Sequence, residues 1–337
     1  MLHYIHYIDY KNIGDMLCGY YNFFQDLYKY DIYIHNISNI NFQIIKKSDT
    51  VIIGGGGLLY NNDSHNHNIN RLLDLSNNVI FWSLGFHNRP NQIVKEDIQF
   101  NKVALLSIRD YNHESNIKYV PCATCMIPYL DYDSNLIKRD IGVVRHAFFQ
   151  KVFDYETITN SSSIENIVNF ISSSNIILTN SYHAAYWSAL MKKKVIIYGK
   201  FANKFDYFKY KPVEYSGNIL NDIDKCNIYH NCLDESRELT VNYFKEIKIF
   251  LNDTEKKSYN IGYEEKDIIK DHMHFINMRN IILAHTINEL DGNVNKLKST
   301  INGLLILIKK LIDKIVWFIP IKKYRDKLRN HMLGLIK

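Results

Sequence analysis

Long apolar runs and cysteines are both scarce in this chain of 337 residues, and each scarcity excludes a class of protein. No run of about 18 uncharged apolar residues occurs, so we expect no transmembrane span. Residues 1–7 form neither a basic region nor an apolar core, so we expect no secretory signal. The five cysteines, an odd number in a long chain, favour a reducing cytoplasm over a disulfide scaffold.

The body of the chain also lacks an excess of charge of either sign. The net charge is +6, but residues 309–337 carry nine Lys or Arg against two Asp, which is +7. The preceding 308 residues therefore sum to −1. This distribution argues against a nucleic-acid groove in the body of the protein. It predicts instead that the C-terminal segment contacts an anionic surface.

Composition and length predict an α/β protein with more than one core. Hydrophobic residues make up 46% of the sequence, and the length favours two domains of about 130 residues each with an extension. Short apolar runs alternate with helix-compatible segments, which is typical of doubly wound parallel sheets. We predict one such domain over residues 1–139, a second over 140–255 and a helical extension over 262–337.

Four consecutive glycines, Gly54–Gly57, directly follow the predicted strand 48–53. Glycine at this point lets the backbone turn sharply or approach a ligand closely, which makes Gly55 and Gly56 candidates for substrate binding. The run lacks the third glycine of a dinucleotide-binding fingerprint and the Gly-Lys-Ser/Thr of a P-loop. A nucleotide-binding motif of either kind is therefore not predicted.

The segment after these glycines, residues 61–70, is polar and rich in Asn and His. We interpret it as a mobile surface loop. Its His65 and His67 offer nitrogen ligands, but no carboxylate or cysteine partner stands out beside them, so no metal site is predicted there.

Charged residues follow two of the predicted strands in the first domain. Asp15 follows a glycine turn, where it either caps a helix predicted to run to Tyr30 or contacts substrate. Arg109 ends another strand, where it either forms a structural ion pair with Asp110 or presents its guanidinium to an anionic substrate. Both readings stay open for each residue.

Basic residues also follow strands in the second domain. Arg145 and His146 end its first predicted strand, and strand ends of open α/β sheets face the ligand cleft. Lys200 ends a later strand and opens the segment 200–215, which is dense in aromatic residues and lysines. That composition suits sugar stacking and phosphate binding, and it fits a loop packed by its own rings equally well. All three residues are candidates for substrate binding.

The segment 175–190 joins a buried strand to the start of a helix. Its apolar run is followed by three polar residues ending at Ser181, all good helix caps, so that His183 falls in the first helical turn. Helix N-termini at this edge of a sheet attract anions. His183 is thus a candidate acid/base group or phosphate contact, and the alternative is a helix-start residue bonded to a neighbouring carbonyl.

Cys122 and Cys125 form a CxxC pair that is redox-active, half of a zinc site, or purely structural. The distant partners for zinc would be Cys226, His230 and Cys232. Neither half has the spacing of a zinc finger, so we interpret the pair as buried thiols lining a turn and predict no metal.

The last seventy residues differ in pattern from the rest. Apolar residues recur there at alternating spacings of three and four over more than four heptads (Ile287, Leu290, Val294, Leu297, Ile301, Leu304, Ile308, Leu311, Ile315, Phe318). This predicts a long helix with one apolar seam, followed by a basic amphipathic piece. The seam either forms a homo-oligomeric coiled coil or packs on the body. The basic piece also fits an anionic membrane surface, and these readings are compatible.

Four short motifs occur together in one order along the first two hundred residues (Asn12-Ile13-Gly14-Asp15, Asp49–Gly56, Ser107-Ile108-Arg109-Asp110 and Thr179–Ala184). In this respect the chain resembles the polysaccharide pyruvyl transferase family. The resemblance implies two Rossmann-like domains in a GT-B-type arrangement. It also implies transfer of pyruvate from phosphoenolpyruvate to a sugar of a surface glycan or its lipid-linked precursor, as a ketal. No cofactor or metal is required by that chemistry.

The resemblance also assigns residues. The essential histidine of the family falls on His183, and the arginine of its Arg-Asp motif falls on Arg109. Many members carry arginine two positions before the histidine, where this chain has Ser181. Either Arg145 or Lys200 then replaces that cation, or the donor is different.

Two other classes of function remain open from the sequence. One is a GT-B-type glycosyltransferase that uses a nucleotide sugar, with Arg145 and the helix after Thr179 holding the diphosphate. The other is a non-catalytic assembly protein that acts through its C-terminal helix. In each case we expect a cytoplasmic protein, peripheral on the inner face of a membrane.

Overall fold

The computed structural model describes residues 1–60, 62–89, 96–113, 117–132, 136–147, 153–258, 294–312 and 322–334. The chain divides into two units, Met1–Asp271 and His272–Lys337. The first unit contains two parallel sheets with helices between their strands, as the sequence predicts for an α/β protein. The boundaries 139/140 and 255 remain predictions.

The first sheet has six parallel strands in the order β2-β1-β3-β4-β5-β6. Their bounds are β1 Leu2–His6, β2 Ile32–Asn36, β3 Thr50–Gly54, β4 Asn78–Leu84, β5 Leu105–Ile108 and β6 Lys118–Tyr119. Every residue of β1 and β3 is buried, which is what a parallel sheet covered on both faces requires. The order also brings the carboxyl ends of β1, β3, β4 and β5 to one edge.

The segment after β1 is less helical than predicted. The helix α1 spans only Ile13–Leu17, and two 3-10 turns, η1 Tyr20–Asn22 and η2 Gln25–Lys29, follow it. Gly19 lies between α1 and η1 in an extended conformation, so the prediction of one helix running to Tyr30 is wrong. Asn12, rather than Asp15, occupies the N-cap position of α1.

The polar segment predicted to be a mobile loop is a helix. It forms most of α2, Asp63–Leu75, which begins where the side chain of Asn62 accepts a hydrogen bond from the backbone N–H of His65 at 2.7 Å. Asn66 and Asn70 are buried because their side-chain amides donate to backbone carbonyls of Glu96 and Asp97. The asparagines therefore satisfy tertiary hydrogen bonds, which a reading of composition cannot reveal.

Four further 3-10 turns lie along the first half of the chain, at Phe42–Ile44 (η3), Phe100–Lys102 (η4), Ala123–Met126 (η5) and Pro128–Asp131 (η6).

The second sheet has five parallel strands in the order β11-β10-β9-β7-β8. Its elements are β7 Arg139–Arg145, β8 Thr157–Thr159, α3 Ile164–Ser172, β9 Ser174–Thr179, α4 Tyr182–Leu190, β10 Lys194–Ile197, η7 Asn203–Phe205, β11 Val213–Glu214 and α5 Ile219–Ile223. The central strand β9 carries the apolar run read from the sequence, and α4 follows it directly.

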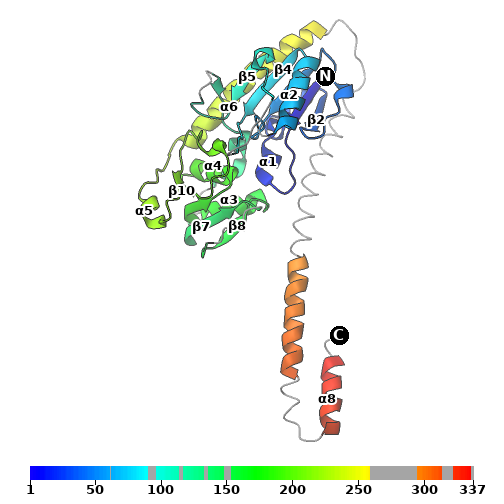
Figure 1. Cartoon of the computed structure of the whole chain (residues 1–337), viewed down its shortest axis with the longest axis vertical. Coiled ribbons are helices and arrows are strands. Elements are labelled where there is room, and N and C mark those ends of the chain that lie inside the picture. The colour runs from blue at the N-terminus through cyan, green and yellow to red at the C-terminus, as the bar shows by residue number, and fades with distance from the viewer. Residues whose placement is uncertain are drawn as a thin grey trace. The chain divides into compact units, whose positions relative to one another are not determined.

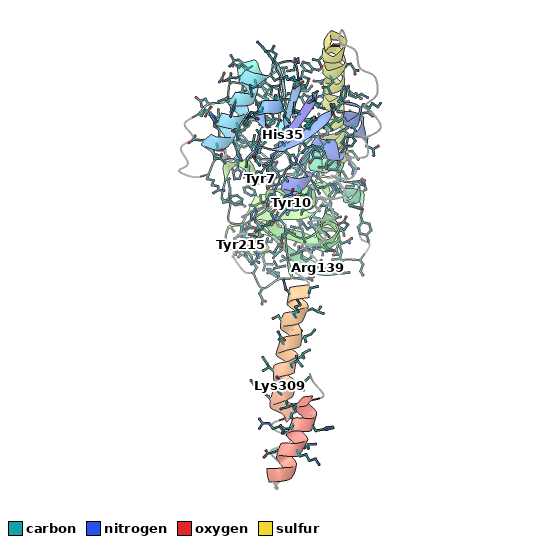
Figure 2. All side chains as sticks on the ribbon, turned by 90° about the vertical axis from the view of Figure 1, so that its right-hand side faces the viewer. Tyr7, Tyr10, His35, Arg139, Tyr215 and Lys309 are labelled. Carbon is teal, nitrogen blue, oxygen red and sulfur yellow. The ribbon has the colours of Figure 1, made fainter. Side chains whose placement is uncertain are left out.

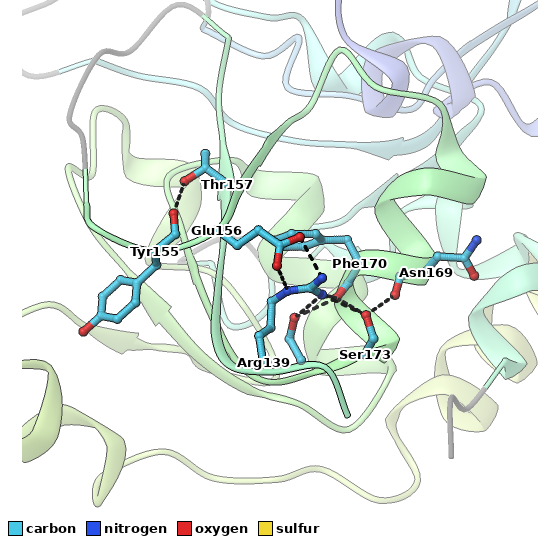
Figure 3. A network of polar contacts seen from close by, with 8 residues as sticks. Arg139, Tyr155, Glu156, Thr157, Asn169, Phe170 and Ser173 are labelled. Carbon is cyan, nitrogen blue, oxygen red and sulfur yellow. Dashed lines mark hydrogen bonds and ion pairs between the residues drawn. The ribbon is translucent and has the colours of Figure 1, made fainter. Parts of the chain in front are cut away.

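Arg139 ties the start of β7 to its neighbours (Figure 3). Its guanidinium makes two hydrogen bonds to the carboxylate of Glu156, each 2.8 Å, and a third group of bonds to Ser173, Ser174 and the carbonyl of Phe170 at the end of α3. A planar guanidinium can make all of these hydrogen bonds at once, so Arg139 fixes the start of β7 against the segment before β8 and the end of α3.

The long helix α6, Cys232–Ser258, returns to the first sheet (Figure 1). Phe244 stacks on Trp82 of β4 with 5.7 Å between ring centroids, and the hydroxyl of Tyr243 donates to the carbonyl of Phe81 at 3.0 Å. Side chains alternate between the faces of a strand, so α6 covers the face opposite to the one on which Val79 and Phe81 pack. The chain therefore crosses back to its first sheet after completing the second.

In the second unit, residues 294–312 are helical and α8 spans Lys322–Gly334. The apolar seam from Val294 to Leu311 lies within the first of these helices, and Lys309 of the same helix is labelled in Figure 2. The seam positions before residue 294 and after 312 lie outside the described residues. Among the helices that the structure describes, none is long and apolar enough to cross a membrane.

Candidate active site

His183 lies in the first turn of α4, as predicted, and is almost fully buried. The preceding loop is held by local hydrogen bonds: the hydroxyl of Thr179 donates to the carbonyl of Val144 and accepts from the backbone N–H of Ser181. Ser181 is the N-cap residue and is itself buried, but its side chain makes no capping bond. The loop therefore fixes the direction in which α4 begins.

The histidine packs against α1 of the first sheet. A Cβ built on Gly14 would lie 2.2 Å from Nδ1 of His183, so only glycine permits this approach. Asp15, the next residue, lies 3.9 Å from the same nitrogen through Oδ1 and accepts a hydrogen bond from the side chain of Asn12 through Oδ2. The glycine and aspartate of the first motif thus meet the histidine of the last one.

The other ring nitrogen of His183 faces two thiols. Its Nε2 lies 3.1 Å from Sγ of Cys18 and 3.7 Å from Sγ of Cys122, and the two sulfurs are 3.8 Å apart. The hydroxyl of Thr124 donates to Cys122 at 3.4 Å. The ring nitrogens therefore face sulfur and carboxylate atoms. The alternative prediction, a hydrogen bond from His183 to a neighbouring carbonyl, is not what the structure shows.

The electrostatic surroundings of the two thiols differ. Burial opposes ionisation of both and raises the pKa of Cys18. For Cys122 the hydrogen bonds with Cys18 and His183 and the charge of Arg109 outweigh burial, and its pKa lies well below the ordinary value. Cys122 is therefore the thiol that ionises first.

Cys122 and Cys125 are buried thiols at the turn η5, as predicted, whereas Cys18 was not predicted as part of the site. Cys226 donates to the carbonyl of Val195, and Cys232 lies 3.1 Å from the carbonyl of Ala189. Cys125 contacts Thr240 of α6. The only available signal for Cys18 was its position three residues after the first motif, and that signal names no partner.

Arg109 follows β5 and is buried beside the same cluster. Its guanidinium lies over the ring of Tyr182 at 4.0 Å from the centroid, and within the described part of the chain its Nε and Nη1 have no hydrogen-bond partner. A Cβ at Gly85 would lie 2.2 Å from Nε, and one at Gly57 would lie 3.2 Å from Nη2. Glycines of two strand ends therefore make room for a buried cation with unfilled donors.

The carboxylate next to this arginine makes a structural contact. Asp110 accepts a hydrogen bond from the backbone N–H of Phe86 at 2.8 Å, and burial raises its pKa to about 7 in spite of the nearby charge of Arg109. Arg109 is thus not neutralised by a fully ionised partner at neutral pH. This leaves the guanidinium available to an anion.

Gly55 and Gly56 both adopt positive φ, of 76° and 86°. A Cβ on Gly55 would lie 2.0 Å from the carbonyl oxygen of Cys18, so a side chain there is excluded by space as well as by conformation. Gly55 therefore serves close packing against Cys18 at the end of α1, whereas Gly57 leaves room for Arg109. Direct approach to a ligand remains a prediction.

The remaining basic residues predicted to bind substrate differ in whether their side chains already have partners. Arg145 ends β7, and its Nε has no hydrogen-bond partner among the described residues. The backbone N–H of His146 donates to the side chain of Asn180, and burial, with Lys204 nearby, lowers the pKa of its ring. Lys200 forms an ion pair with Asp206 of its own loop.

Lys204 in η7 is a further cation at the site, and it was not among the residues predicted from the sequence. Its ammonium lies 4.7 Å from the ring centroid of Phe201 and 5.9 Å from that of Tyr182. Burial lowers its pKa to about 8, with Arg109 acting in the same direction and Asp15 against it. Burial also lowers the pKa of His87 to about 2, with added contributions from the positive Lys204 and Arg109. The centre therefore carries a positive potential suited to an anionic ligand.

Residues 12–199, more than half of the chain, match the sequence profile of a family described as Polysaccharide pyruvyl transferase. A search of curated proteins found no matching relative. The matched span contains Asp15, Arg109 and His183 with both cysteines of the cluster, and it ends just before Lys200 and Lys204.

Proposed function

The chain belongs to the polysaccharide pyruvyl transferase family, a family of transferases, and we propose that it moves a pyruvyl group from phosphoenolpyruvate to a sugar. The acceptor is a sugar of a cell-surface polysaccharide or of its lipid-linked precursor, and the product is a cyclic ketal. The observation that carries this proposal is the buried guanidinium of Arg109 over the ring of Tyr182, whose Nε and Nη1 make no hydrogen bond among the described residues.

The donor carries a carboxylate and a phosphate, so its site needs several converging cations. Arg109 supplies a planar fork suited to either anion. The arginine common in the family two positions before His183 is Ser181 here, and the position of Lys204 supports it as the replacement cation. Lys200 is less suited because Asp206 already pairs with it, while Arg145 keeps an unfilled donor.

His183 is proposed to move the proton. A proton delivered to the methylene carbon of the donor makes its C2 electrophilic, and a sugar hydroxyl attacks C2 as it loses its own proton. A second hydroxyl of the sugar then displaces phosphate from C2 and closes the ketal. Asp15 beside Nδ1 would orient the imidazole, as carboxylates do for catalytic histidines.

Several wider features are part of the same proposal. The two sheets, together with α6 returning to the first, support a GT-B-type arrangement. The basic segment 309–337 supports a cytoplasmic, peripheral location at an anionic membrane surface, and the apolar seam supports self-association.

The donor is tested first by thermal shift. Phosphoenolpyruvate should raise the Tm of the full chain, and nucleoside diphosphates and nucleotide sugars should not. Replacement of Arg109 by Met should remove the shift. A shift with nucleotide sugars alone would refute the pyruvyl donor and favour a glycosyltransferase. No shift with any of these ligands, together with tight self-association, would favour an assembly protein.

Catalysis is tested by steady-state kinetics at saturating acceptor. His183→Ala should lower kcat by about 10²–10⁴-fold with a small change in the donor KM, because it removes acid/base catalysis. Arg109→Lys should mainly raise the donor KM, because it binds the ground and transition states alike. A near-normal kcat in His183→Ala, in a protein that still melts cooperatively, would contradict the proton-transfer role.

A further inference from the structure

Three side chains with metal-ligating atoms converge at the centre of the first unit: Cys18 from the end of α1, Cys122 before η5, and His183 from α4. All three are buried, and their sulfur and nitrogen atoms lie within 4.8 Å of one another. Among the described residues this is the one group of three or more histidine, cysteine or acidic side chains arranged in this way.

The spacing of the three atoms is close to that of a tetrahedral zinc centre. With zinc–sulfur bonds of about 2.3 Å and a zinc–nitrogen bond of about 2.0–2.1 Å, tetrahedral angles place two sulfurs about 3.8 Å apart and sulfur and nitrogen about 3.6 Å apart. The observed separations are 3.8 Å for Cys18 to Cys122, 3.7 Å for Cys122 to His183 and 3.1 Å for Cys18 to His183. The two distances that involve Cys122 already fit this geometry, and the distance from Cys18 to His183 must lengthen by about 0.5 Å.

The groups around the cluster suit a bound cation. The Nε2 atom of His183 faces the sulfurs, and its Nδ1 faces the carboxylate of Asp15, which is the usual arrangement of a metal-bound histidine and its outer carboxylate. Thr124 donates to Cys122, which stabilises a thiolate. Two thiolates and a neutral imidazole also balance the charge of a divalent ion, so that a metal adds no net charge beside Arg109.

We propose that Cys18, Cys122 and His183 bind a divalent cation of the zinc type, with the fourth position open to water or an exogenous ligand. Two thiolates and one imidazole in a tetrahedral arrangement select zinc over magnesium, calcium or manganese, which prefer oxygen ligands. A small cavity of about 10 Å³ borders Cys122 and Arg109, about the space of one water molecule.

The site has a consequence for turnover, which rests on the proposed function. Zinc would occupy Nε2 of His183, and an imidazole nitrogen bound to a metal cannot accept or deliver a proton. Zinc-loaded protein is therefore inactive in pyruvyl transfer, and a chelator restores activity.

The experiment uses the reduced full chain under anaerobic conditions, with Co²⁺ as a spectroscopic probe. One equivalent should produce thiolate-to-cobalt charge-transfer absorption and the intense visible bands of tetrahedral cobalt, and Zn²⁺ should abolish both. Cys18→Ser and Cys122→Ser should each weaken the charge-transfer band. Cys125→Ser is the matched control and should leave the spectrum unchanged, because the Cys125 sulfur contacts Thr240 instead.

A second measurement needs no variant. Cys18 and Cys122 are buried, so an alkylating reagent reaches them only when the chain transiently opens. Zinc should slow this alkylation, as mapped by mass spectrometry, and should not alter the labelling of the half-buried Cys226. Absence of cobalt absorption with fully reduced thiols would overturn the site, as would unchanged absorption in the double variant of Cys18 and Cys122. A disulfide between these two cysteines in anaerobically purified protein would also overturn it and identify a redox pair.

Failure of the site and failure of the proposed function are distinguishable. Metal binding is read from absorption and labelling without any substrate, and pyruvyl transfer is assayed on metal-free protein. If zinc binds as described but metal-free protein transfers no pyruvyl group, the metal site stands and the proposed function fails. If transfer proceeds unchanged with zinc bound, the site stands and the proton role of His183 is wrong.

Discussion

Gly14 offers a test of the site that removes no chemical group. In Gly14→Ala the new Cβ would lie 2.2 Å from Nδ1, 2.3 Å from Cγ and 2.7 Å from Cβ of His183. Non-bonded carbon atoms prefer about 3.5–4.0 Å, so either α1 or the imidazole must shift by more than about 1 Å. The ring cannot simply retreat, because Cys18 lies against Nε2 and Trp187 packs 5.6 Å from its centroid.

The magnitude follows from two opposing effects. Alanine in a helix is favoured over glycine by about 0.5–1 kcal/mol, whereas forcing an extra carbon into a packed core costs about 1–3 kcal/mol. We expect a net loss of about 0.5–2 kcal/mol of unfolding free energy. Displacement of a catalytic group by about 1 Å lowers the rate by about 10²-fold, so activity should fall much further than stability.

The assay combines chemical denaturation with steady-state turnover. Gly303→Ala is the matched control, because Gly303 also lies inside a helix and its added Cβ would meet no atom within 4 Å apart from the adjacent residues and backbone of its own helix. It should be neutral or slightly stabilising and keep full activity. If Gly14→Ala keeps both the stability and the rate of the original chain, then α1 does not lie against His183 and the geometry of the site is wrong.

Three further predictions concern the donor, pH and the C-terminal unit. Lys204→Met should weaken phosphoenolpyruvate binding about 10–100-fold, as measured by titration, because it removes a charge-assisted hydrogen bond. Lys200→Met should have little effect on this affinity, and equal losses in the two variants would contradict the role of Lys204. Burial lowers the pKa of His6 to about 4, so the folded state resists a proton that the unfolded state accepts below pH 6.5. Stability should therefore fall as the pH drops from 6.5 towards 4, by about 2 kcal/mol at pH 5, and denaturation of His6→Gln should lack this part of the loss. Deletion of residues 285–337 should abolish self-association, liposome binding or both in sedimentation and flotation assays, and unchanged behaviour in both would refute a role of the tail in either.

The sequence pattern was sufficient to predict features that depend only on neighbouring residues in the chain. The buried strand before Thr179 and the helix start at His183 were read correctly, because burial of a parallel strand leaves a continuous apolar run and helix caps have few residue types. The same holds for Arg109 at the end of β5. The order of the family motifs also lies in the sequence itself.

Local pattern failed where a polar residue is satisfied by a distant one. The asparagines of α2 indicate a loop by composition, but their amides bond to the segment after β4, so the chain can bury them within a helix. The helix after β1 ends early for a local reason, the extended conformation of Gly19, although the sequence pattern predicted a helix to Tyr30. Lys204 was visible only as one lysine among several, since its approach to Tyr182 of α4 depends on the tertiary fold.

The buried strands, the family, the basic tail and two residues of the site, Arg109 and His183, could be identified from the sequence alone. Which of the five cysteines meet the histidine depends on the tertiary fold. Cys18 lies 165 residues before His183, and Cys122 lies 61 before it. No periodicity along the chain encodes such a contact. It arises because the strand ends of both sheets converge on α1, where Gly14 lets the two halves of the first unit approach to contact distance.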